Sequence, residues 1–341
     1  MVKSQYDIAV VGATGLVGET TLEILAEREF PVGHLHALAS ARSVGKFVQS
    51  GGRRLKVQDL AEFDFSGTDI ALFSAGGSVS EAHAPRAGDA GCIVIDNTSH
   101  FRNEPDVPLV VPEVNPEVLA EYGARNIIAS PNCSTIQMVV ALKPIYDAVG
   151  IDRINVATYQ AVSGAGRALV EALAGQTAGM LNGSPVDMEG DEKPIAFNVI
   201  PHIDVFMDNG YTREEMKMVW ETRKIFDDES IRVNPSTVRV PVFYGHSEAI
   251  HIETREKISA AQVRALLEVA PGVSVLDDTK LGGYPTAVTE AAKQDDVFVG
   301  RIREDISHDH GINLWVVADN VRKGAALNTI QIAEILVSDY I

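Results

Sequence analysis

The chain has 341 residues, of which 45% are hydrophobic, and these values predict a large buried core and two domains rather than a disordered chain. Its formal net charge of −18 argues against a nucleic-acid partner, because phosphates would be repelled unless a basic patch were concentrated somewhere. The sequence has no long uncharged apolar run, so it predicts neither a signal peptide nor a membrane span, and its two cysteines favour a reducing, cytoplasmic setting.

The first 130 residues alternate between short apolar runs and helical or loop segments. Residues 6–12 predict a strand that ends in glycine, and residues 16–26 have helical spacing. Further runs that predict strands occupy residues 34–39, 69–74, 92–96, 109–111 and 127–129. This alternation predicts a parallel sheet covered by helices.

Three glycines at the first strand–helix junction indicate a dinucleotide site. Gly12, Gly15 and Gly18 stand where glycine permits a tight turn and the close approach of a pyrophosphate to a helix N-terminus. The spacing is G-x-x-G-x-x-G, and a purely structural turn would also explain it. Its position at the start of the alternating region favours a Rossmann-type domain.

The end of the second predicted strand favours NADP over NAD. An NAD site usually places an acid there, on the ribose 2′-hydroxyl, and residues 39–43 contain none. Arg42, with the hydroxyls of Ser40 and Ser43, suits a 2′-phosphate instead, because a guanidinium binds phosphate in a bidentate manner.

One of the two cysteines stands where a turn leads into a helix. Residues 130–135 read Ser-Pro-Asn-Cys-Ser-Thr, and residues 136–149 have the spacing of an amphipathic helix. The backbone N–H groups and dipole of a helix start favour thiolate over thiol, so Cys133 is a candidate nucleophile. Cys92, within an apolar run, fits the alternative of a buried and inert cysteine.

Beyond residue 150 the pattern changes to longer runs with a period of two, which predict a mixed or antiparallel sheet. These runs occupy residues 153–161, 237–243, 248–254, 297–303 and 312–318. Residues 175–194 are expected to form a mobile loop, and residues 324–340 a helix that packs on the first domain. The predicted domains are therefore residues 1–130 with 321–341, and residues 131–320.

Several polar residues end predicted strands of the second domain. His246 and Arg239 flank one turn, with Arg239 on the face opposite the valines of its strand, and Gln160 precedes a glycine-rich turn. Glu214 and Lys217 are three residues apart on one helix face, where a solvated surface ion pair is the simplest interpretation. The histidine pairs at 34 and 36 and at 308 and 310 lack the ligand spacing of a zinc site, so no metal is expected.

The chain resembles aspartate-β-semialdehyde dehydrogenase over nearly its whole length. The resembling segments are residues 12–18, 97–102, 111–115, 130–135, 159–166, 214–217, 239–248, and 318–320 with 324–328. The resemblance implies a glyceraldehyde-phosphate-dehydrogenase-like α/β fold: a Rossmann-type NADP-binding domain and a second α+β domain. It also implies a homodimer, with a tetramer left open.

The implied reaction is the reversible, NADPH-dependent reduction of β-aspartyl phosphate to aspartate semialdehyde and phosphate, in lysine, threonine and methionine biosynthesis. By resemblance, Cys133 attacks the acyl carbon to form a thioester. His246 is the general acid/base, with an imidazole pKa near neutrality, and Gln160 orients the acyl intermediate.

The resemblance also implies binding residues. Arg239 corresponds to the arginine for the substrate α-carboxylate and Glu214 to the acid for its α-ammonium, although Glu215 is adjacent and leaves that choice open. Arg102, Lys217 and Asn132 correspond to groups that bind phosphate. The cofactor positions are Gly12, Thr14, Gly15, Leu16, Val17, Arg42, Ser43, Ser163, Gly164 and Asn320.

Two alternatives are considered. N-acetyl-γ-glutamyl-phosphate reductase shares this chemistry and plan, but its acetylated nitrogen needs no acid such as Glu214. A non-catalytic binding protein with the same fold is disfavoured by the joint presence of Cys133, Gln160, Arg239 and His246.

Overall fold

The computed structural model describes residues 3–183 and 193–341, which divide into two compact units. The first consists of residues 1–132 with 325–341, and the second of residues 133–324. Within the described residues, no helix is long and apolar enough to cross a membrane.

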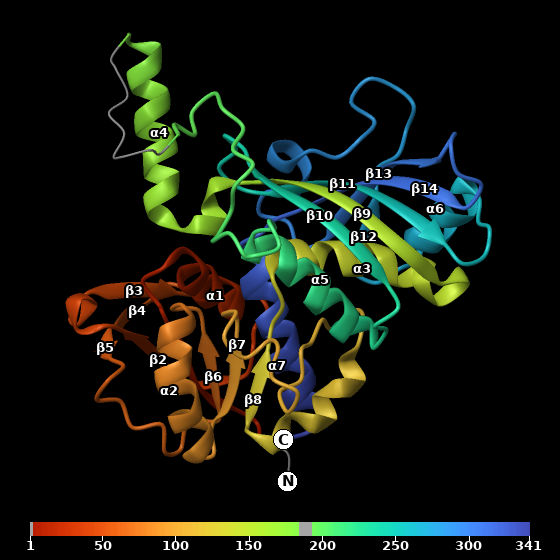
Figure 1. The fold of residues 1–341 in the computed structure, drawn as a ribbon. Helices are drawn as coiled ribbons and strands as arrows, with labels where there is room; N and C mark the ends of the chain where they lie inside the picture. Colours follow the sequence, from red (N-terminus) through yellow and green to blue (C-terminus); the bar gives the residue numbers. More distant parts are fainter. Residues whose placement is uncertain (1–2, 184–192) are drawn as a thin grey trace. The chain divides into compact units, whose positions relative to one another are not determined.

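The first unit is built on a six-stranded parallel sheet in the order β5-β2-β1-β6-β7-β8. Helices α1 and α7 contact each other, whereas α2 packs on β6, β7 and β8 (Figure 1). Its elements are β1 (Tyr6–Val11), α1 (Leu16–Glu27), β2 (Val32–Ala39), η1 (Ala41–Ser43), β3 (Phe47–Ser50), β4 (Arg53–Lys56), β5 (Gln58–Asp59), β6 (Ile70–Phe73), α2 (Gly77–Asp89), β7 (Ile93–Asp96), η2 (Pro116–Ala124), β8 (Ile127–Ala129) and α7 (Leu327–Asp339).

The second unit is built on a mixed sheet in the order β10-β9-β11-β14-β13-β12. Strand β11 runs antiparallel to both β9 and β14, while β10 runs parallel to β9. Its elements are α3 (Cys133–Val149), β9 (Ile151–Gln160), η3 (Val162–Ala165), α4 (Arg167–Leu181), α5 (Arg213–Phe226), β10 (Arg232–Arg239), β11 (His246–Thr254), α6 (Ala260–Glu268), β12 (Val273–Val275), η4 (Ala287–Ala291), β13 (Val297–Glu304), β14 (Gly311–Ala318) and the start of η5 (Arg322–Ala326).

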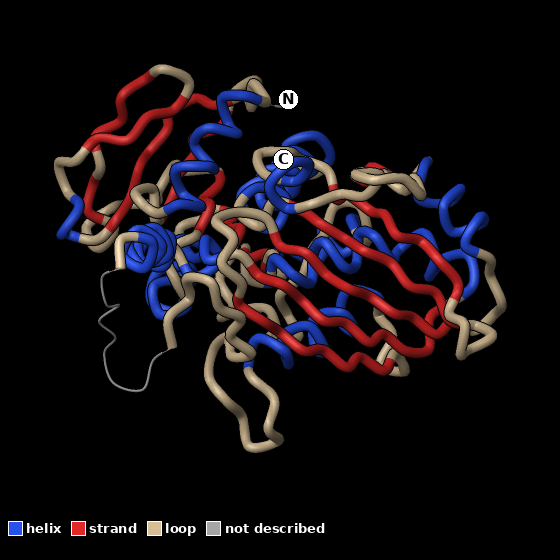
Figure 2. The backbone as a smooth tube through the Cα atoms, turned by 90° about the horizontal axis from the view of Figure 1, so that it is seen from above, coloured by secondary structure: helices blue, strands red, loops and turns tan. Residues whose placement is uncertain are grey.

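One face of this second sheet is covered by α3 and α5. Helix α3 contacts β9, β11, β13 and β14, and α5 contacts β10. Figure 2 shows the strands from the other side, with these helices behind them. The predicted Rossmann-type domain and mixed second sheet are therefore confirmed.

Three predicted segments differ from the structure. Residues 109–111 form no strand, only a bridge from Leu109 to Ala129, because prolines at 108 and 112 remove backbone donors on both sides. Strand β10 ends at Arg239 rather than continuing to residue 243, since Pro241 follows. Of the predicted loop at 175–194, residues 175–181 belong to α4, and residues 184–192 lie outside the described residues.

Candidate active site

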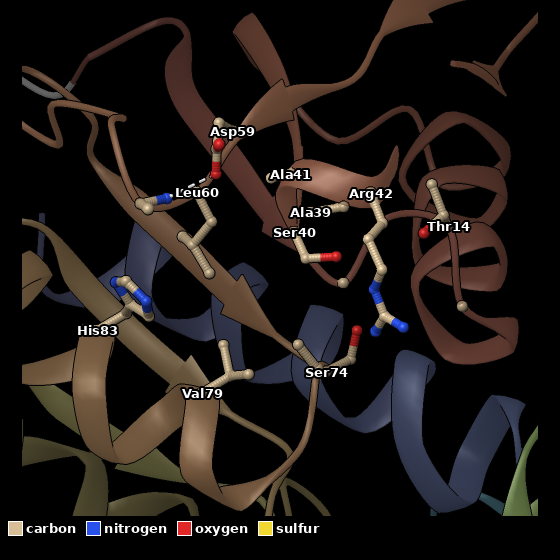
Figure 3. A pocket seen from close by; sticks show the side chains of 14 residues that line it. Thr14, Ala39, Ser40, Ala41, Arg42, Asp59, Leu60, Ser74, Val79 and His83 are labelled. Carbon is tan, nitrogen blue, oxygen red and sulfur yellow. Dashed lines mark hydrogen bonds between the residues drawn. The ribbon is translucent and has the colours of Figure 1, made fainter. Parts of the chain in front are cut away.

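A pocket of about 490 Å³ lies in the first unit, at the carboxyl ends of β1, β2 and β6. The strand order reverses between β1 and β6, and in doubly wound sheets ligands bind in the crevice at this point. The pocket is lined by Gly12, Thr14, Gly15, Ala39, Ser40, Ala41, Arg42, Asp59, Leu60, Ala61, Ser74, Ala75, Val79 and His83 (Figure 3).

Two of the predicted glycines are required by the β1–α1 turn. Gly12 has φ +86°, and a Cβ there would lie 3.0 Å from the backbone nitrogen of Ala75. A Cβ on Gly18 would lie 2.2 Å from the carbonyl oxygen of Gly12. A side chain at Gly12 would collide with the segment that follows β6, and a side chain at Gly18 would push α1 away from the turn, so the second glycine keeps the helix N-terminus at the pocket.

The predicted cofactor residues are distributed over both units. Gly12, Thr14, Gly15 and Arg42 line the pocket, and Arg42 extends into it between Thr14 and Ser74 in Figure 3. Leu16 and Val17 open α1, and Ser43 ends η1, without lining the pocket. In the second unit, Asn320 Oδ1 accepts hydrogen bonds from Ser163 Oγ (3.1 Å) and Gly245 N (2.9 Å), and Gly164 lies in η3.

The pocket also contains an acid, which comes from a strand that the sequence analysis did not predict. Strand β2 itself ends at Ala39 without one, but Asp59 ends β5, pairs in register with Ala39, and lines the same pocket. Its Oδ1 accepts a hydrogen bond from Ala61 N at 3.1 Å. A two-residue strand has no periodicity to detect, so no sequence signal places Asp59 there.

In the second unit, three predicted residues meet at one end of neighbouring strands. Arg239 of β10 pairs in register with Gln160 of β9, and Ser247 of β11 pairs with Tyr159. Because side chains alternate along a strand, Arg239, Gln160 and His246 share one face of the sheet. Cys133, the first residue of α3, belongs to the helix that covers this face.

The acid and amide of this group are joined by hydrogen bonds. Gln160 Nε2 donates to Glu214 Oε1 at 3.0 Å, and Lys217 Nζ donates to Glu214 Oε2 at 3.1 Å and to Asp204 Oδ2 at 2.8 Å. The Lys217 side chain is only 15% exposed, so the interpretation as a solvated surface pair is wrong. We call Cys133, Gln160, Glu214, Lys217, Arg239 and His246 the active-site cluster.

The adjacent Glu215 accepts hydrogen bonds from the backbone at the start of α5 and from β10. Its carboxylate accepts hydrogen bonds from Thr212 N (2.7 Å), within the capping box of α5, and from Thr237 N (3.0 Å) of β10. Glu214 points instead to Gln160 and Lys217. The geometry therefore separates the two acids that the sequence left as alternatives.

The backbone of Ala161 positions two members of the active-site cluster. Its N–H donates to His246 Nδ1 at 3.0 Å, and its carbonyl accepts from Arg239 Nη1 at 2.8 Å. Burial lowers the pKa of Arg239, while the negative charges of Glu214 and Cys133 oppose that shift. A Cβ on Gly164 would lie 3.1 Å from Arg239 Nη1 and 3.3 Å from His246 Nε2, so glycine keeps the space over both groups open.

The expected near-neutral pKa of His246 is not found. Burial, and then the charge of Arg239, lower the pKa of this fully buried imidazole to about 3. Because Nδ1 accepts the hydrogen bond from Ala161, the ring proton resides on Nε2. Nε2 has no hydrogen-bond partner among the described residues, so the ring offers an N–H donor to a bound molecule.

The two cysteines have contrasting environments. Cys92 is completely buried, and burial raises its pKa to about 12, which confirms the interpretation as an inert residue. Cys133 is half-buried at the start of α3. A Cβ on Gly324 would lie 2.7 Å from the Cβ of Cys133, so this unpredicted glycine makes room beside the thiol. A thiol at a helix start that interacts electrostatically with the guanidinium of Arg239 can perform acyl-transfer chemistry.

The remaining predicted phosphate ligands belong to the first unit. Arg102 is 6% exposed and its Nη2 donates to Asn97 O at 2.9 Å. Asn132, directly before Cys133 in the chain, is also buried. Among the residues that the structure describes, no group of three or more histidines, cysteines or acids is arranged to hold a metal ion.

Two family models match the chain. The model described as semialdehyde dehydrogenase, NAD binding domain, matches residues 7–122, and that described as semialdehyde dehydrogenase, dimerisation domain, matches residues 142–323. Aspartate-semialdehyde dehydrogenase 2 of Vibrio cholerae serotype O1 is 63% identical over 98% of this chain and 99% of its own. The chain belongs to the aspartate-semialdehyde dehydrogenase family.

Solved structures of aspartate-semialdehyde dehydrogenases agree in fold. Aspartate semialdehyde dehydrogenase II from Vibrio cholerae, complexed with ASA, has a TM-score of 0.97, 62% identity, and coverage of 99% of this chain and 100% of its own. The Candida albicans enzyme with NADP has a TM-score of 0.77, 28% identity and 98% coverage of both chains. The comparisons therefore do not favour the alternative of N-acetyl-γ-glutamyl-phosphate reductase.

Iodoacetamide should distinguish the two cysteines of this family member. We expect Cys133 to be alkylated at mildly acidic to neutral pH and Cys92 to remain unmodified in the folded protein, because Cys92 is buried with a pKa of about 12. Peptide mass spectrometry against pH measures both sites. Modification of Cys92 before Cys133 would contradict the assignment.

An NMR titration should show that His246 stays neutral without substrate. With its pKa lowered to about 3, the ring should remain uncharged from pH 8 to about pH 4 and gain its proton only below that range. A His246→Asn variant assigns its ring signal. A ring titrating near the ordinary histidine pKa of about 6.5 and missing from that variant would overturn this conclusion.

Proposed function

We propose that the chain catalyses the reversible reductive dephosphorylation of L-4-aspartyl phosphate to L-aspartate 4-semialdehyde and phosphate, with NADP as cofactor. The observation that carries this proposal is the half-buried Cys133 at the start of α3. The same unit holds the buried guanidinium of Arg239 and the imidazole N–H of His246, which has no partner among the described residues. Membership of the aspartate-semialdehyde dehydrogenase family supports the substrate. The reaction belongs to lysine, threonine and methionine biosynthesis.

The nucleophile is Cys133. Its thiolate attacks the acyl carbon of aspartyl phosphate, the C–O bond to phosphate breaks, and a thioester remains on the enzyme. Gln160, held by Glu214, orients the acyl group. When bound, NADPH supplies the hydride that reduces the thioester.

His246 stabilises the oxygen that gains charge during these steps. In its neutral form the ring donates the Nε2 proton as a hydrogen bond to the developing oxyanion. Full proton transfer from the ring requires a proton on Nδ1, and therefore requires the hydrogen bond from Ala161 to break. General acid/base action by His246 is thus coupled to a local movement of that peptide.

The substrate is recognised by opposite charges. Arg239 binds its α-carboxylate, and Glu214 binds its α-ammonium, since the carboxylate of Glu215 is occupied by the backbone of α5 and β10. Lys217, Arg102 and Asn132 bind the phosphate. The positive charges of Arg239, Lys217 and Arg102 supply local positive potential in a chain of net charge −18.

The pocket of the first unit fits a dinucleotide. Gly12, Thr14 and Gly15 provide the helix start for the pyrophosphate, and Arg42 binds the 2′-phosphate of NADP. Asp59 lines the same pocket and would favour a ribose hydroxyl, so the preference for NADP depends on Arg42. By resemblance, Ser163, Gly164 and Asn320 are also cofactor positions.

The enzyme is a homodimer that associates through the open face of the second sheet. This face carries Tyr159, 37% exposed, in ring contact with Trp315. The matching family model is described as a dimerisation domain. A cytoplasmic location and the absence of a nucleic-acid partner stay predictions from composition.

The activity can be tested with aspartate semialdehyde, inorganic phosphate and NADP. NADPH absorbance should rise only when all three are present, and Cys133→Ala should lower the rate by at least about 10³-fold, as expected when a nucleophile is removed. Cys92→Ala is the matched control and should keep activity. Turnover of N-acetylglutamate semialdehyde alone, or an active Cys133→Ala variant, would contradict the proposal.

The cofactor preference can be tested with Arg42→Ala. We expect KM for NADP to rise about 10- to 100-fold, because a hydrogen bond to a charged group contributes about 1.5–3 kcal/mol, and KM for NAD to change little. Arg54→Ala, on β4 against the Phe47 ring and outside the pocket, is the control. Equal losses with both cofactors, or tighter binding of NAD by the unmodified protein, would disprove the assignment.

A further inference from the structure

A second row of polar side chains lies behind the active-site cluster on the same sheet face. In β9, Thr158 precedes Gln160 by two residues, and β10 and β11 carry equivalent neighbours, Thr237 and Glu248. The register pairs Thr237 with Thr158 and Thr158 with Glu248. Three adjacent strands therefore place a polar side chain one repeat away from the active-site residues Gln160, Arg239 and His246.

Helix α3 adds a fourth member to this row. Gln137 follows Cys133 by four residues, so it lies one helical turn further along the same face of α3. Helix α3 contacts β9 and β11, which carry Thr158 and Glu248. We define Gln137, Thr158, Thr237 and Glu248 as the second row.

The second row is fully buried yet poorly satisfied. Gln137, Thr158 and Glu248 have 0% exposure and Thr237 has 1%. Both carboxyl oxygens of Glu248, both amide atoms of Gln137 and both threonine hydroxyls have no hydrogen-bond partner among the described protein atoms. Such groups are rare in folded proteins, because each costs about 1–3 kcal/mol unless water or a ligand satisfies it.

The uncharged polar groups of the second row suit a neutral molecule rather than an ion. Burial raises the pKa of Glu248 well above its usual value, and the nearby Gln137 amide opposes this only in part, without a direct hydrogen bond of normal geometry. No member of the row carries a compensating positive charge. A protonated acid, an amide and two hydroxyls each offer donors and acceptors, which suits water rather than an ion.

We propose that Glu248 is a positioning residue for the active site, acting as an uncharged acid that internal water bridges to Gln137 and Thr158. The bridge ties β11, next to His246, to α3, one turn from Cys133. It thereby fixes the separation of the imidazole and the thiol. This inference rests on the roles of Cys133 and His246 in the proposed function.

The test compares Glu248→Gln with Glu248→Met. Glutamine keeps the size and the hydrogen-bonding groups of the neutral acid, so kcat should change by less than about threefold. Methionine keeps the length but removes the polar atoms, and kcat should fall about 10- to 100-fold, as expected when reacting groups are misplaced. Glu229→Gln and Glu229→Met, at a carboxylate that is 88% exposed after α5, are matched controls and should leave kcat unchanged.

Two measurements without substrate separate this inference from the proposed function. The infrared difference between wild type and Glu248→Gln should contain the C=O stretch of a protonated carboxylic acid. The rate of Cys133 alkylation at fixed pH should fall in Glu248→Met but not in Glu248→Gln. Both results hold even if the chain acts on a different substrate.

Three results would overturn the inference: a carboxylate band for Glu248, a large loss in Glu248→Gln, or unchanged kcat and alkylation in a folded Glu248→Met. If Glu248→Met does not fold, Thr158→Val provides the same comparison, because it removes one hydroxyl at nearly constant volume. It should slow both turnover and Cys133 alkylation. A folded Thr158→Val with unchanged rates would equally overturn the inference.

Discussion

The geometry of the candidate active site depends on the backbone of one residue, Ala161. The N–H of Ala161 fixes the tautomer of His246, and its carbonyl orients the guanidinium of Arg239. Both bonds come from a backbone segment that directly follows β9, so neither side chain depends on a flexible partner. The hydrogen bond from Ala161 N–H leaves Nε2 of His246 as a donor. Because this hydrogen bond uses only the backbone of residue 161, that residue needs no particular side chain.

Strand pairing places the other candidate site residues on the same sheet face. Parallel pairing of β10 with β9 sets Arg239 beside Gln160, and antiparallel pairing of β11 places His246 on the same face. Helix α3 packs on this face, and its first residue is Cys133. Polar side chains thus lie in two rows across strands whose other residues on this face form a hydrophobic core. The second row is more deeply buried than the row of Gln160, Arg239 and His246.

Local patterns were sufficient to predict most of the fold and the placement of Cys133 at a helix start, whereas the roles of the candidate site residues came from the family resemblance and stay predictions. The Ser-Pro-Asn-Cys-Ser-Thr segment breaks a strand and starts α3, and the period-two runs became β9, β11, β13 and β14. The prediction of a strand at residues 109–111 was wrong, because the apolar pattern does not show that the prolines at 108 and 112 lack backbone N–H donors. The protonation of His246 and the place of Asp59 could not be predicted, since burial and the pairing of a two-residue strand arise only from tertiary contacts.

The connectivity of the first unit has a consequence for how the chain folds. Helix α7 belongs to this unit, where Leu327, Ile330 and Leu336 are buried in its core and Tyr6 donates a hydrogen bond to the carbonyl of Ile341. A ribosome makes β1 first but α7 only after all of residues 133–324. During synthesis the apolar face that α7 covers therefore stays exposed until residues 327–339 have been made. The second unit is contiguous in sequence and can fold before that point. The unfinished first unit is thus the part of the nascent chain most exposed to aggregation.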